Sequence, residues 1–575
     1  MNLNLKATAD ATYDAIVVGS GVSGGWAAKE LTQKGLRVLM LERGRNLEHI
    51  TGYETALKAP WELPHRGLTV LRPEKTDPQF RIHVPNEQNG DFWFDDRNAP
   101  YREIQPFDWY RPDILGGKSV MWGRQSYRWS EMDFEANARD GIGNDWPIRY
   151  KDLEPWYGYV EKFAGISGRK EGLAQLPDSD FLPPMDMMCV EEHVARQLKT
   201  KMNRVMTIGR TANLSKATPE QMALGRADCQ YRNLCSRGCP YGAYFSTLSA
   251  TLPAARKTNR LTVRTGSIVS EVLFDEKASG AATGRAKGVR VVDALTGQTT
   301  EYYARIIFLN ASAIATNFIL LSSVSSRFPN GFGNDSGTLG RYIMDHHFQI
   351  GASGRAEDMG FEDKYYYGRR ANGIYIPRYR NIGNDKRDYL RGFGYQGGAS
   401  RSGWQRLVSE MDFGAALKEK ASQPGPWTMG LVAFGECLPY EDNRLSLDRT
   451  RLDKWGLPMM TFDVKFRENE MLMRKDMGND AAEMLEAAGL KNVSIYDNKS
   501  IPGGAIHEMG GVRMGRDPKT SMLNAYNQLW AARNVFVTDG AAFASVACQN
   551  PSLTFMALTA RAASHAVGEL KRRNL

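Results

Sequence analysis

The segment from residue 14 to residue 42 restricts the fold of this chain more than any other. An apolar run at residues 15–18 leads into the turn Gly19-Ser20-Gly21-Val22-Ser23-Gly24-Gly25, and a helix-like stretch follows at residues 26–33. A second apolar run ends at Glu42, about 20 residues beyond the glycines. Glycines at this spacing let the backbone approach a pyrophosphate, and the acidic residue holds a ribose hydroxyl. We therefore expect Gly19, Gly21, Gly24 and Glu42 to bind a dinucleotide.

The choice between NAD and FAD comes from the other end of the chain. Residues 534–538 form an apolar run that ends in Asp539-Gly540. Flavoproteins place such an Asp-Gly pair against the pyrophosphate and the ribityl chain. This second strand therefore favours FAD, with Asp539 and Gly540 as further cofactor-binding residues.

Size and charge narrow the class of protein. A chain of 575 residues exceeds the size at which a single core keeps growing, so we expect two domains or one with a large insertion. The formal net charge of +9 is spread among nearly as many acids, which argues against nucleic acid. Neither a signal-peptide pattern nor a run of ~18 apolar residues is found, so the polypeptide itself is expected to carry no targeting signal and no membrane span.

Three of the six cysteines lie close together, at Cys229, Cys235 and Cys239, and Pro240 follows the last. A zinc site would require a fourth Cys or His nearby, and a disulfide plus one thiol would suit an oxidising compartment. A [3Fe–4S] cluster requires only three thiolates, and the proline is typical of iron–sulfur loops. The other three cysteines have no such spacing and are expected to be small core residues, although Cys548 precedes Asn550 closely enough to line a pocket. These three are Cys189, Cys437 and Cys548.

Motifs along nearly the whole chain resemble those of the glucose–methanol–choline (GMC) oxidoreductases, in the order of that family. They are Glu42-Arg43-Gly44, Leu115-Gly116-Gly117-Lys118-Ser119, Trp122-Gly123, Trp146-Pro147-Ile148, Leu153-Glu154-Pro155-Trp156-Tyr157, residues 306–312, Leu339-Gly340-Arg341, Asp345-His346, Asn443-Arg444-Leu445, His507-Glu508-Met509-Gly510 and Asn550-Pro551-Ser552-Leu553-Thr554. The resemblance implies an α/β fold, in which a Rossmann-like FAD-binding domain carries a discontinuous α+β substrate domain built on an antiparallel sheet.

The resemblance also implies a domain plan. The FAD-binding domain is expected to comprise residues 8–60, 110–135, 225–345 and 505–575, with the iron–sulfur loop at 225–245. The substrate domain is expected to comprise residues 61–109, 136–224 and 346–504.

The family's catalytic roles map onto His507 and Asn550. In such enzymes a histidine takes the proton of the substrate hydroxyl while hydride moves to the flavin, and a second polar group orients the alcohol. For Asn550 a structural role is also open, because Asn-Pro is a good start for the helix-like run that follows. A helix beginning there would direct its positive end towards the flavin, so Asn550 is counted among the cofactor-binding residues as well.

Further cofactor contacts are implied by position in the family motifs. They are Arg43, Gly116, Gly117 and Ser119. Some members attach FAD covalently through a histidine after the Gly-Gly segment, but the matching stretch at residues 119–122 contains none. We therefore expect tight, non-covalent FAD.

The cysteine spacing resembles the cluster loop in the catalytic subunits of bacterial FAD-dependent sugar dehydrogenases. The resemblance implies a carbohydrate substrate and a cytochrome c-type electron acceptor. It also implies a small companion subunit, whose twin-arginine signal exports the cofactor-loaded enzyme to the periplasm. A cytoplasmic location is the alternative. The motifs as a whole are most similar to those of glucoside 3-dehydrogenases, which convert a ring C3 hydroxyl into a ketone. Oxidation of a free aldose, ketose or aldonate is the alternative activity, and an O2-using pyranose oxidase or a non-enzymatic electron-transfer subunit is less favoured.

Two aromatic runs are candidates for stacking against carbohydrate, although core packing explains such runs as well. They are Phe92-Trp93-Phe94 and Tyr365-Tyr366-Tyr367.

Overall fold

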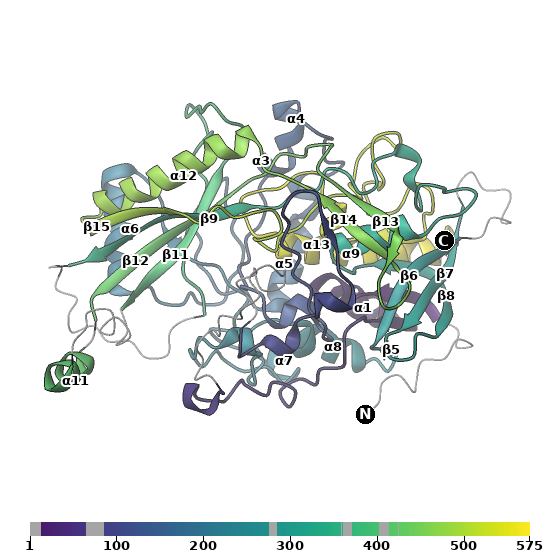
Figure 1. The fold of residues 1–575 in the computed structure, drawn as a ribbon, viewed down its shortest axis with the longest axis horizontal. Helices are drawn as coiled ribbons and strands as arrows, with labels where there is room; N and C mark the ends of the chain where they lie inside the picture. The colour runs from purple at the N-terminus through teal and green to yellow at the C-terminus, as the bar shows by residue number, and fades with distance from the viewer. Residues whose placement is uncertain are drawn as a thin grey trace.

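The computed structural model describes residues 13–64, 86–274, 284–357, 359, 371–401, 413–423 and 425–575. Two sheet regions lie side by side in Figure 1, one around β9, β11 and β12 and the other around β5 to β8. The predicted aromatic run at Tyr365 to Tyr367 lies outside the described residues.

The first region is a seven-stranded sheet in the order β5-β2-β1-β8-β7-β6, with β16 also paired to β8. Its central strands are parallel, whereas β6, β7 and β8 pair antiparallel. The strands are β1 (Tyr13–Val18), β2 (Val38–Leu41), β5 (Leu261–Arg264), β6 (Ser267–Phe274), β7 (Ala286–Asp293), β8 (Thr299–Leu309) and β16 (Val535–Val537). Residues 15–17 are fully buried, as expected for a strand covered on both faces.

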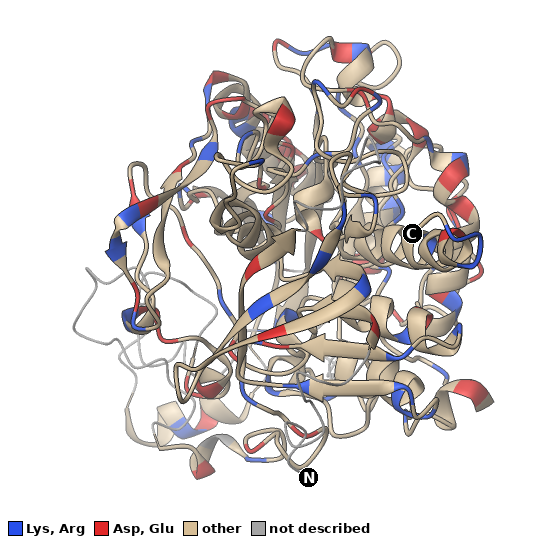
Figure 2. Ribbon diagram, turned by 90° about the vertical axis from the view of Figure 1, so that its right-hand side faces the viewer, with Lys and Arg blue, Asp and Glu red and all other residues tan. Residues whose placement is uncertain are grey.

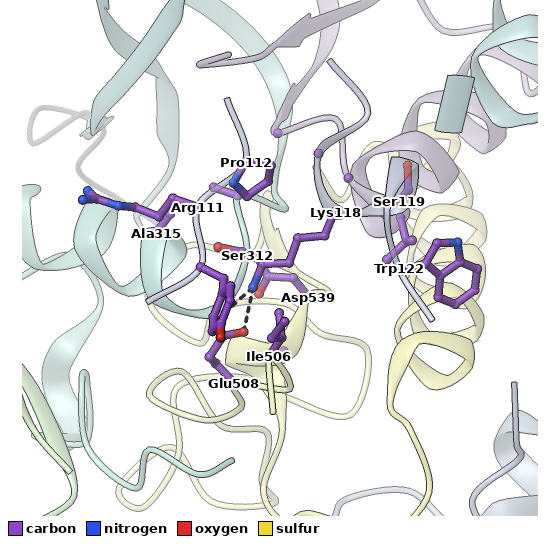
Figure 3. Close-up of a pocket in the computed structure, with 18 of the residues that line it drawn as sticks. Arg111, Pro112, Lys118, Ser119, Trp122, Ser312, Ala315, Ile506, Glu508 and Asp539 are labelled. Carbon is purple, nitrogen blue, oxygen red and sulfur yellow. Dashed lines mark hydrogen bonds and ion pairs between the residues drawn. The ribbon is translucent and has the colours of Figure 1, made fainter. Parts of the chain in front are cut away.

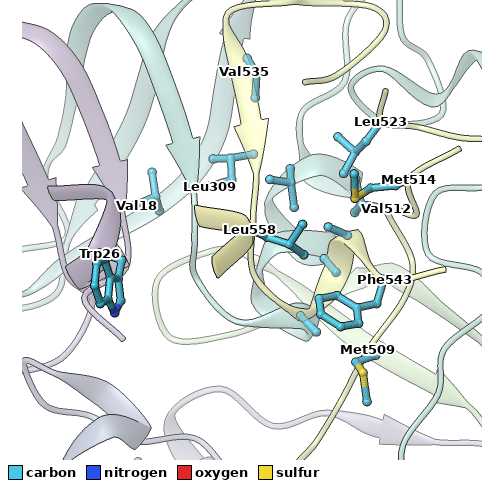
Figure 4. Close-up of a cluster of buried hydrophobic side chains, with 14 of the residues drawn as sticks. Val18, Trp26, Leu309, Met509, Val512, Met514, Leu523, Val535, Phe543 and Leu558 are labelled. Carbon is cyan, nitrogen blue, oxygen red and sulfur yellow. The ribbon is translucent and has the colours of Figure 1, made fainter. Parts of the chain in front are cut away.

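Helix α1 (Val22–Gln33) packs against this sheet, and α13 (Ser552–Lys571) contacts both α1 and α5 (Tyr150–Ala164). The core between them joins segments that are distant in sequence. Figure 4 shows part of it, where Val18 and Leu309 of the sheet, Leu558 of α13 and Phe543 of the C-terminal loop come together. The two ends of the chain therefore build one nucleotide-binding region.

The second region is a six-stranded antiparallel sheet in the order β15-β9-β12-β11-β10-β4. Its strands are β4 (Thr207–Ile208), β9 (His347–Ala356), β10 (Ile374–Ile376), β11 (Phe393–Arg401), β12 (Trp427–Gly435) and β15 (Lys491–Asp497). Helix α12 (Glu468–Ala487) covers one face, and α6 (Cys189–Met202) packs beside it. Alternate residues of β12 are buried, which is the pattern of a sheet with one covered face.

Smaller elements complete the described chain. A three-stranded sheet consists of β13 (Arg444–Leu452), β14 (Pro458–Asp463) and β3 (Arg102–Glu103). The remaining α-helices are α3 (Glu131–Phe134), α4 (Ala136–Asp140), α7 (Pro219–Met222), α8 (Leu252–Arg256), α9 (Ala313–Ser322) and α11 (Gly414–Ser422).

The expected fold class is confirmed: a Rossmann-like α/β region stands beside an α+β region built on an antiparallel sheet. The strands of the first region come from three separate stretches of the chain, so the nucleotide-binding region is discontinuous. The residue boundaries of the domain plan stay a prediction.

Lys and Arg positions are interspersed among Asp and Glu positions along the chain in the view of Figure 2. None of the described helices combines the length and the apolar character that crossing a membrane requires.

Candidate active site

A cavity of about 770 Å³ lies where the two regions meet. This volume is within the range of about 300–1,000 Å³ for small-molecule and cofactor pockets. Most of the predicted site residues line it: Gly19, Gly21, Glu42, Arg43, Gly117, Ser119, His507, Asp539, Gly540 and Asn550. Gly24 and Gly116 lie behind the lining.

Three of the four glycines in the N-terminal turn have different roles. Gly19 adopts φ +90°, and a Cβ there would lie 2.4 Å from the carbonyl oxygen of Asn310. A Cβ on Gly24 would lie 1.9 Å from the carbonyl oxygen of Gly19, so this glycine lets helix α1 pack against the turn. A Cβ on Gly21 would meet nothing within 4 Å. Gly21 is therefore the position at which the turn opens to the cavity, at the N-terminus of α1.

Glu42 is buried at the end of β2 and holds the turn in place. Its carboxylate accepts hydrogen bonds from the backbone N–H groups of Ser20 (3.0 Å) and Gly44 (2.7 Å) and from the Ser20 hydroxyl. Burial raises the pKa of Glu42, and those hydrogen bonds act in the opposite direction. The Ser20 hydroxyl in turn accepts the N–H of Gly116 at 2.8 Å, which ties the second glycine segment to the first.

Ser119 lies on the cavity wall, and its hydroxyl is occupied within the protein. The hydroxyl donates to the carbonyl of Gly116 (2.5 Å) and accepts the N–H of Thr247 (3.0 Å). Gly117 has φ +52°, a left-handed conformation that suits glycine.

Asp539 lies on the opposite wall, after β16. It accepts hydrogen bonds from the Thr316 hydroxyl (2.6 Å) and the Ala541 N–H (3.0 Å), and burial raises its pKa to about 6. The next residue, Gly540, lies close to the catalytic loop, because a Cβ there would be 2.4 Å from the carbonyl oxygen of Glu508.

Arg43 stacks on aromatic rings, with its guanidinium carbon 4.0 Å from the ring centre of Phe94 and 5.2 Å from that of Trp455. Burial lowers its pKa to about 10, and no hydrogen-bond partner for its Nε is found among the described residues. The aromatic run at residues 92–94 is thus divided. Trp93 lines the cavity, whereas Phe92 and Phe94 are buried.

His507 and Asn550 meet at one end of the cavity, with 3.2 Å between His507 Nε2 and Asn550 Nδ2. Asp345 holds the loop that carries the histidine, because its carboxylate accepts the N–H groups of Ala505 (3.2 Å) and His507 (3.0 Å). The ring of His346 lies behind His507, with 2.8 Å between their Nδ1 atoms.

The environment keeps His507 neutral. Burial lowers its pKa well below the ordinary value, and the charge of Lys118 acts in the same direction. A neutral imidazole that faces a cavity is the form a general base requires.

The N-cap role that the sequence left open for Asn550 is taken by another residue. Helix α13 begins at Ser552, and its N-cap is Pro551, which forms no side-chain cap. The Asn550 side chain instead faces His507, and its Oδ1 accepts a hydrogen bond from Gln396 Nε2 at 2.7 Å. Cys548 is buried and does not line the cavity.

An ion pair that sequence reasoning did not assign extends across the cavity. Lys118 Nζ lies 3.0 and 2.9 Å from the two carboxylate oxygens of Glu508, as Figure 3 shows. Both residues stand within the quoted motifs, beside Gly117 and His507, so their positions were visible in the sequence although their pairing was not.

The part of the cavity next to His507 has a polar wall and an aromatic one. The polar wall comprises Arg124, Gln125, Asn372 and Gln396, and the aromatic wall comprises Phe348 and Phe434. Among the described residues no partner is found for Asn372 Nδ2 or Arg124 Nε. Both atoms are buried polar groups without a described partner, on residues that line the cavity. No local sequence pattern marked them, because they come from separate loops and strands.

The cysteine loop lies next to the cavity, because Asn233 belongs to both. Cys229, Cys235 and Cys239 are partly exposed free thiols; burial raises the pKa of Cys229 to about 11, and the other two thiols act in the same direction. Among the described residues, however, no group of three or more His, Cys, Asp or Glu side chains is placed to hold a metal ion. The structure therefore does not show the expected cluster site, and the cluster stays a prediction.

Comparison with known proteins decides the family. The two GMC oxidoreductase family models match residues 13–348 and 439–559. The chain belongs to the GMC oxidoreductase family. It is similar to 2-methyl-1,2-propanediol dehydrogenase of Mycolicibacterium austroafricanum, with 26% identity over 98% of this chain and 96% of that protein. It is also similar to the fructose dehydrogenase large subunit of Gluconobacter japonicus, with 24% identity over 97% of this chain and 98% of that one.

Among solved structures, pyridoxine 4-oxidase from Mesorbium loti aligns with a TM-score of 0.58 at 16% identity, covering 96% of this chain and 98% of that one. This likeness shows the GMC fold. Membership of the family makes the chain an oxidoreductase that acts on alcohol groups and implies FAD.

The residues present fit FAD. The open position at Gly21 precedes a 12-residue helix, whose N-terminal N–H groups suit a pyrophosphate. The buried Glu42 and Asp539 and the stacked Arg43 line the same cavity. Together they supply the carboxylates, the cation and the glycine turn that a dinucleotide requires.

Proposed function

We propose that this enzyme is an FAD-dependent dehydrogenase that oxidises a ring hydroxyl of a sugar, with C3 of glucosides and disaccharides as the first candidate. The observation that carries the proposal is the pair at one end of the cofactor cavity, a neutral His507 whose Nε2 lies 3.2 Å from Asn550 Nδ2. Bound FAD would supply the hydride acceptor.

The chain's own residues handle the proton. His507 takes the hydroxyl proton at Nε2, and the amide of Asn550 donates to the substrate oxygen and holds the alcohol in line. Asp345 keeps the histidine loop in place through its two backbone hydrogen bonds. Lys118, paired with Glu508 in the same cavity, adds a positive charge near the base.

A sugar substrate is supported by the polar side chains and the aromatic rings that line the same cavity. A polyol presents hydroxyls on its edges and an apolar C–H face, which match the two walls. The similarity to a fructose dehydrogenase large subunit supports the same class of substrate. The C3 position is supported by the motif resemblance.

We also propose a [3Fe–4S] cluster on Cys229, Cys235 and Cys239, which would supply a one-electron exit from the flavin towards a cytochrome c-type acceptor. A nearby guanidinium supports it. Arg226 is buried, donates from Nε to the Gly242 carbonyl at 3.0 Å, and has no described partner for Nη2. The N–H of Gly242 donates to the Cys239 carbonyl at 3.1 Å, so this cation stands beside the cysteine loop. An anionic cluster would balance its charge.

The proposed partners are a small companion subunit that carries a twin-arginine signal and a cytochrome c-type acceptor, with the enzyme in the periplasm. The relative named as a dehydrogenase large subunit supports a partner subunit. Co-purification of a small chain with the enzyme from its native host would test for this partner subunit.

Oxidation of a free sugar or an aldonate is the second candidate. The buried cation of Arg124 on the cavity wall favours an aldonate, because a sugar acid carries a carboxylate that would pair with a guanidinium.

The test is anaerobic reduction of the FAD-loaded enzyme by methyl glucoside, cellobiose, glucose, fructose and gluconate, followed by product analysis. Bleaching by glucosides with a 3-keto product supports the first proposal, and preferential bleaching by gluconate supports the second. Failure of every sugar, while small diols bleach the flavin, would refute the sugar assignment. Turnover with O2 as fast as with cytochrome c would indicate an oxidase instead.

A further inference from the structure

A chain of hydrogen bonds runs from a backbone carbonyl through the two histidines to Gln396, on strand β11 of the antiparallel sheet. It begins at the carbonyl oxygen of Ala547, 2.5 Å from His346 Nε2. The two Nδ1 atoms of His346 and His507 are 2.8 Å apart. His507 Nε2 is 3.2 Å from Asn550 Nδ2, and Asn550 Oδ1 is 2.7 Å from Gln396 Nε2.

The carbonyl fixes which nitrogen of His346 carries the proton. A carbonyl oxygen only accepts, so Nε2 of His346 must donate. His346 is fully buried, and burial lowers its pKa to about 4, so the ring is neutral and Nδ1 holds a lone pair. One proton must lie between the two Nδ1 atoms. It therefore belongs to His507.

The same logic fixes the remaining groups. A neutral His507 that carries its proton on Nδ1 presents a lone pair at Nε2, towards the cavity. The Asn550 group that faces this lone pair must then be the NH2, which leaves Oδ1 to accept from the amide of Gln396. Every orientation in the chain follows from the single carbonyl at residue 547.

We propose that His346 is a positioning residue, which sets the tautomer of His507 and the amide orientation of Asn550 by transmitting the direction of the Ala547 carbonyl. The inference rests on the proposed role of His507 as base. In the opposite tautomer, Nε2 of His507 would carry a proton and could not accept one from the substrate. The acceptor at His346 also stabilises the imidazolium that forms once His507 takes the proton.

The other titratable groups around His507 do not perform this task. Asp345 accepts the backbone N–H of His507, and Glu508 is paired with Lys118. The charge of Lys118 lowers the pKa of His507. Among the described residues, the hydrogen bond recorded for the His507 Nδ1 atom is the one to His346.

The first test compares His346→Leu with His346→Gln in the FAD-loaded enzyme. Leucine removes the donor and the acceptor, whereas the glutamine amide offers both across one carbon, as the imidazole does. The readout is stopped-flow reduction by the sugar that reduces the wild type fastest, with FAD content and Tm as fold controls. A wrong tautomer costs up to about 10⁴-fold in a serine protease triad. We expect the flavin of His346→Leu to be reduced at least ~100-fold more slowly than that of the wild type. The flavin of His346→Gln should be reduced at least ~10-fold faster than that of His346→Leu. Equal rates for the two variants, or a leucine variant within ~3-fold of the wild type, would overturn the proposal.

The pH profile separates positioning from packing. Losing the hydrogen-bond acceptor at His346 destabilises the protonated form of His507. The acid limb of the pH–rate profile of flavin reduction should therefore move to lower pH in His346→Leu and return in His346→Gln. A merely structural residue would lower the rate without moving the limb.

A second pair of variants tests the far end of the chain without altering the histidines. Gln396→Glu places a carboxylate oxygen against Asn550 Oδ1, whereas Gln396→Met only removes the donor. We expect the flavin of the glutamate variant to be reduced by sugar at least ~10-fold more slowly than that of the methionine variant. Equal rates would contradict a directional chain.

Nitrogen-15 spectra of histidine-labelled, FAD-loaded wild type give a readout that requires no substrate. Signals assigned by their loss in His346 and His507 variants should show a protonated Nδ1 for His507 and a protonated Nε2 for His346. A protonated Nε2 on neutral His507 would overturn the inference, whichever alcohol proves to be the substrate. Correct tautomers with no reduction by any sugar would leave the positioning role intact and refute the sugar assignment.

Discussion

Gly24 and Gly21 occupy one turn, and the structure predicts opposite effects when each is replaced by alanine. A methyl carbon on Gly24 would lie 1.9 Å from the Gly19 carbonyl oxygen, whereas ordinary contact begins at 3.4 Å, so helix and turn must separate by about 1.5 Å. A methyl carbon on Gly21 meets nothing within 4 Å and extends towards the cavity. Gly24→Ala should therefore damage the fold, and Gly21→Ala should damage cofactor binding.

The magnitude for Gly24→Ala follows from the size of the clash. Overpacking costs typically about 1–3 kcal/mol, and a collision with backbone belongs at the upper end. An unfolding entropy of roughly 2.1 cal/mol/K per residue gives about 1.2 kcal/mol/K for 575 residues. A loss of about 3 kcal/mol therefore lowers Tm by about 2–3 °C if the chain unfolds as one unit.

The assay is calorimetric unfolding of the apoproteins, with FAD titrated into each. Gly21→Ala should keep the apoprotein Tm within about 0.5 °C of the wild type and weaken FAD binding at least ~10-fold, because its methyl occupies the path of the pyrophosphate. Gly24→Ala should lower the apoprotein Tm. An unchanged apoprotein Tm in Gly24→Ala, or wild-type FAD affinity in Gly21→Ala, would refute this assignment of the two glycines.

Three other predictions concern the site. Cys235→Ser should remove iron and abolish turnover with cytochrome c, while reduction of the flavin by sugar stays within ~3-fold of the wild type; full cytochrome turnover in the iron-free variant would argue against the cluster. Because the pKa of His507 is lowered, flavin reduction should stay constant from pH 8 down to about pH 6, and a midpoint near the ordinary value of about 6.5 would contradict its burial. Burial, with Glu508 nearby, raises the pKa of Asp345 from 3.8 to about 8. Its carboxyl is then protonated in the folded state and ionised in the unfolded state between these values, so the free energy of unfolding should fall as pH rises from about 4 to 8. Asp345→Asn should flatten that slope in urea titrations at fixed pH values, and an unaltered slope would exclude Asp345 as its source.

The nucleotide-binding region was predictable from sequence because its determinants are local. Gly19 requires a positive φ, Glu42 follows within the same unit, and both are fixed by the steric rules of a strand–turn–helix. The distant strand before Asp539 was also visible from its own apolar run and Asp-Gly pair, but its pairing with β8 was not given by any local pattern.

The catalytic end was only partly predictable. His507 and Asn550 were found through motifs, but Asn550 also matched a helix start, and the structure shows that Pro551 takes the cap position while Asn550 turns to Gln396. His346 stands in a quoted motif, yet its role depends on a ring 161 positions away in sequence. Such pairings are set by tertiary packing, so sequence spacing does not reveal them.

The cysteine loop shows a limit of a different kind. The spacing of Cys229, Cys235 and Cys239 predicts a cluster, whereas the described residues contain no group placed to hold a metal ion. Iron analysis of anaerobically purified protein decides the matter, with about three irons per chain expected and none expected if the loop is purely structural.

The central claim is that His507 is the base for oxidation of a sugar by bound FAD. The most direct test is anaerobic stopped-flow reduction of FAD-loaded wild type and His507→Ala by the same sugar, at equal FAD content. Losing a positioned general base typically costs about 10²–10⁴-fold, so we predict that the alanine variant binds FAD and reduces it at least ~100-fold more slowly. Reduction at the wild-type rate in His507→Ala would contradict the account.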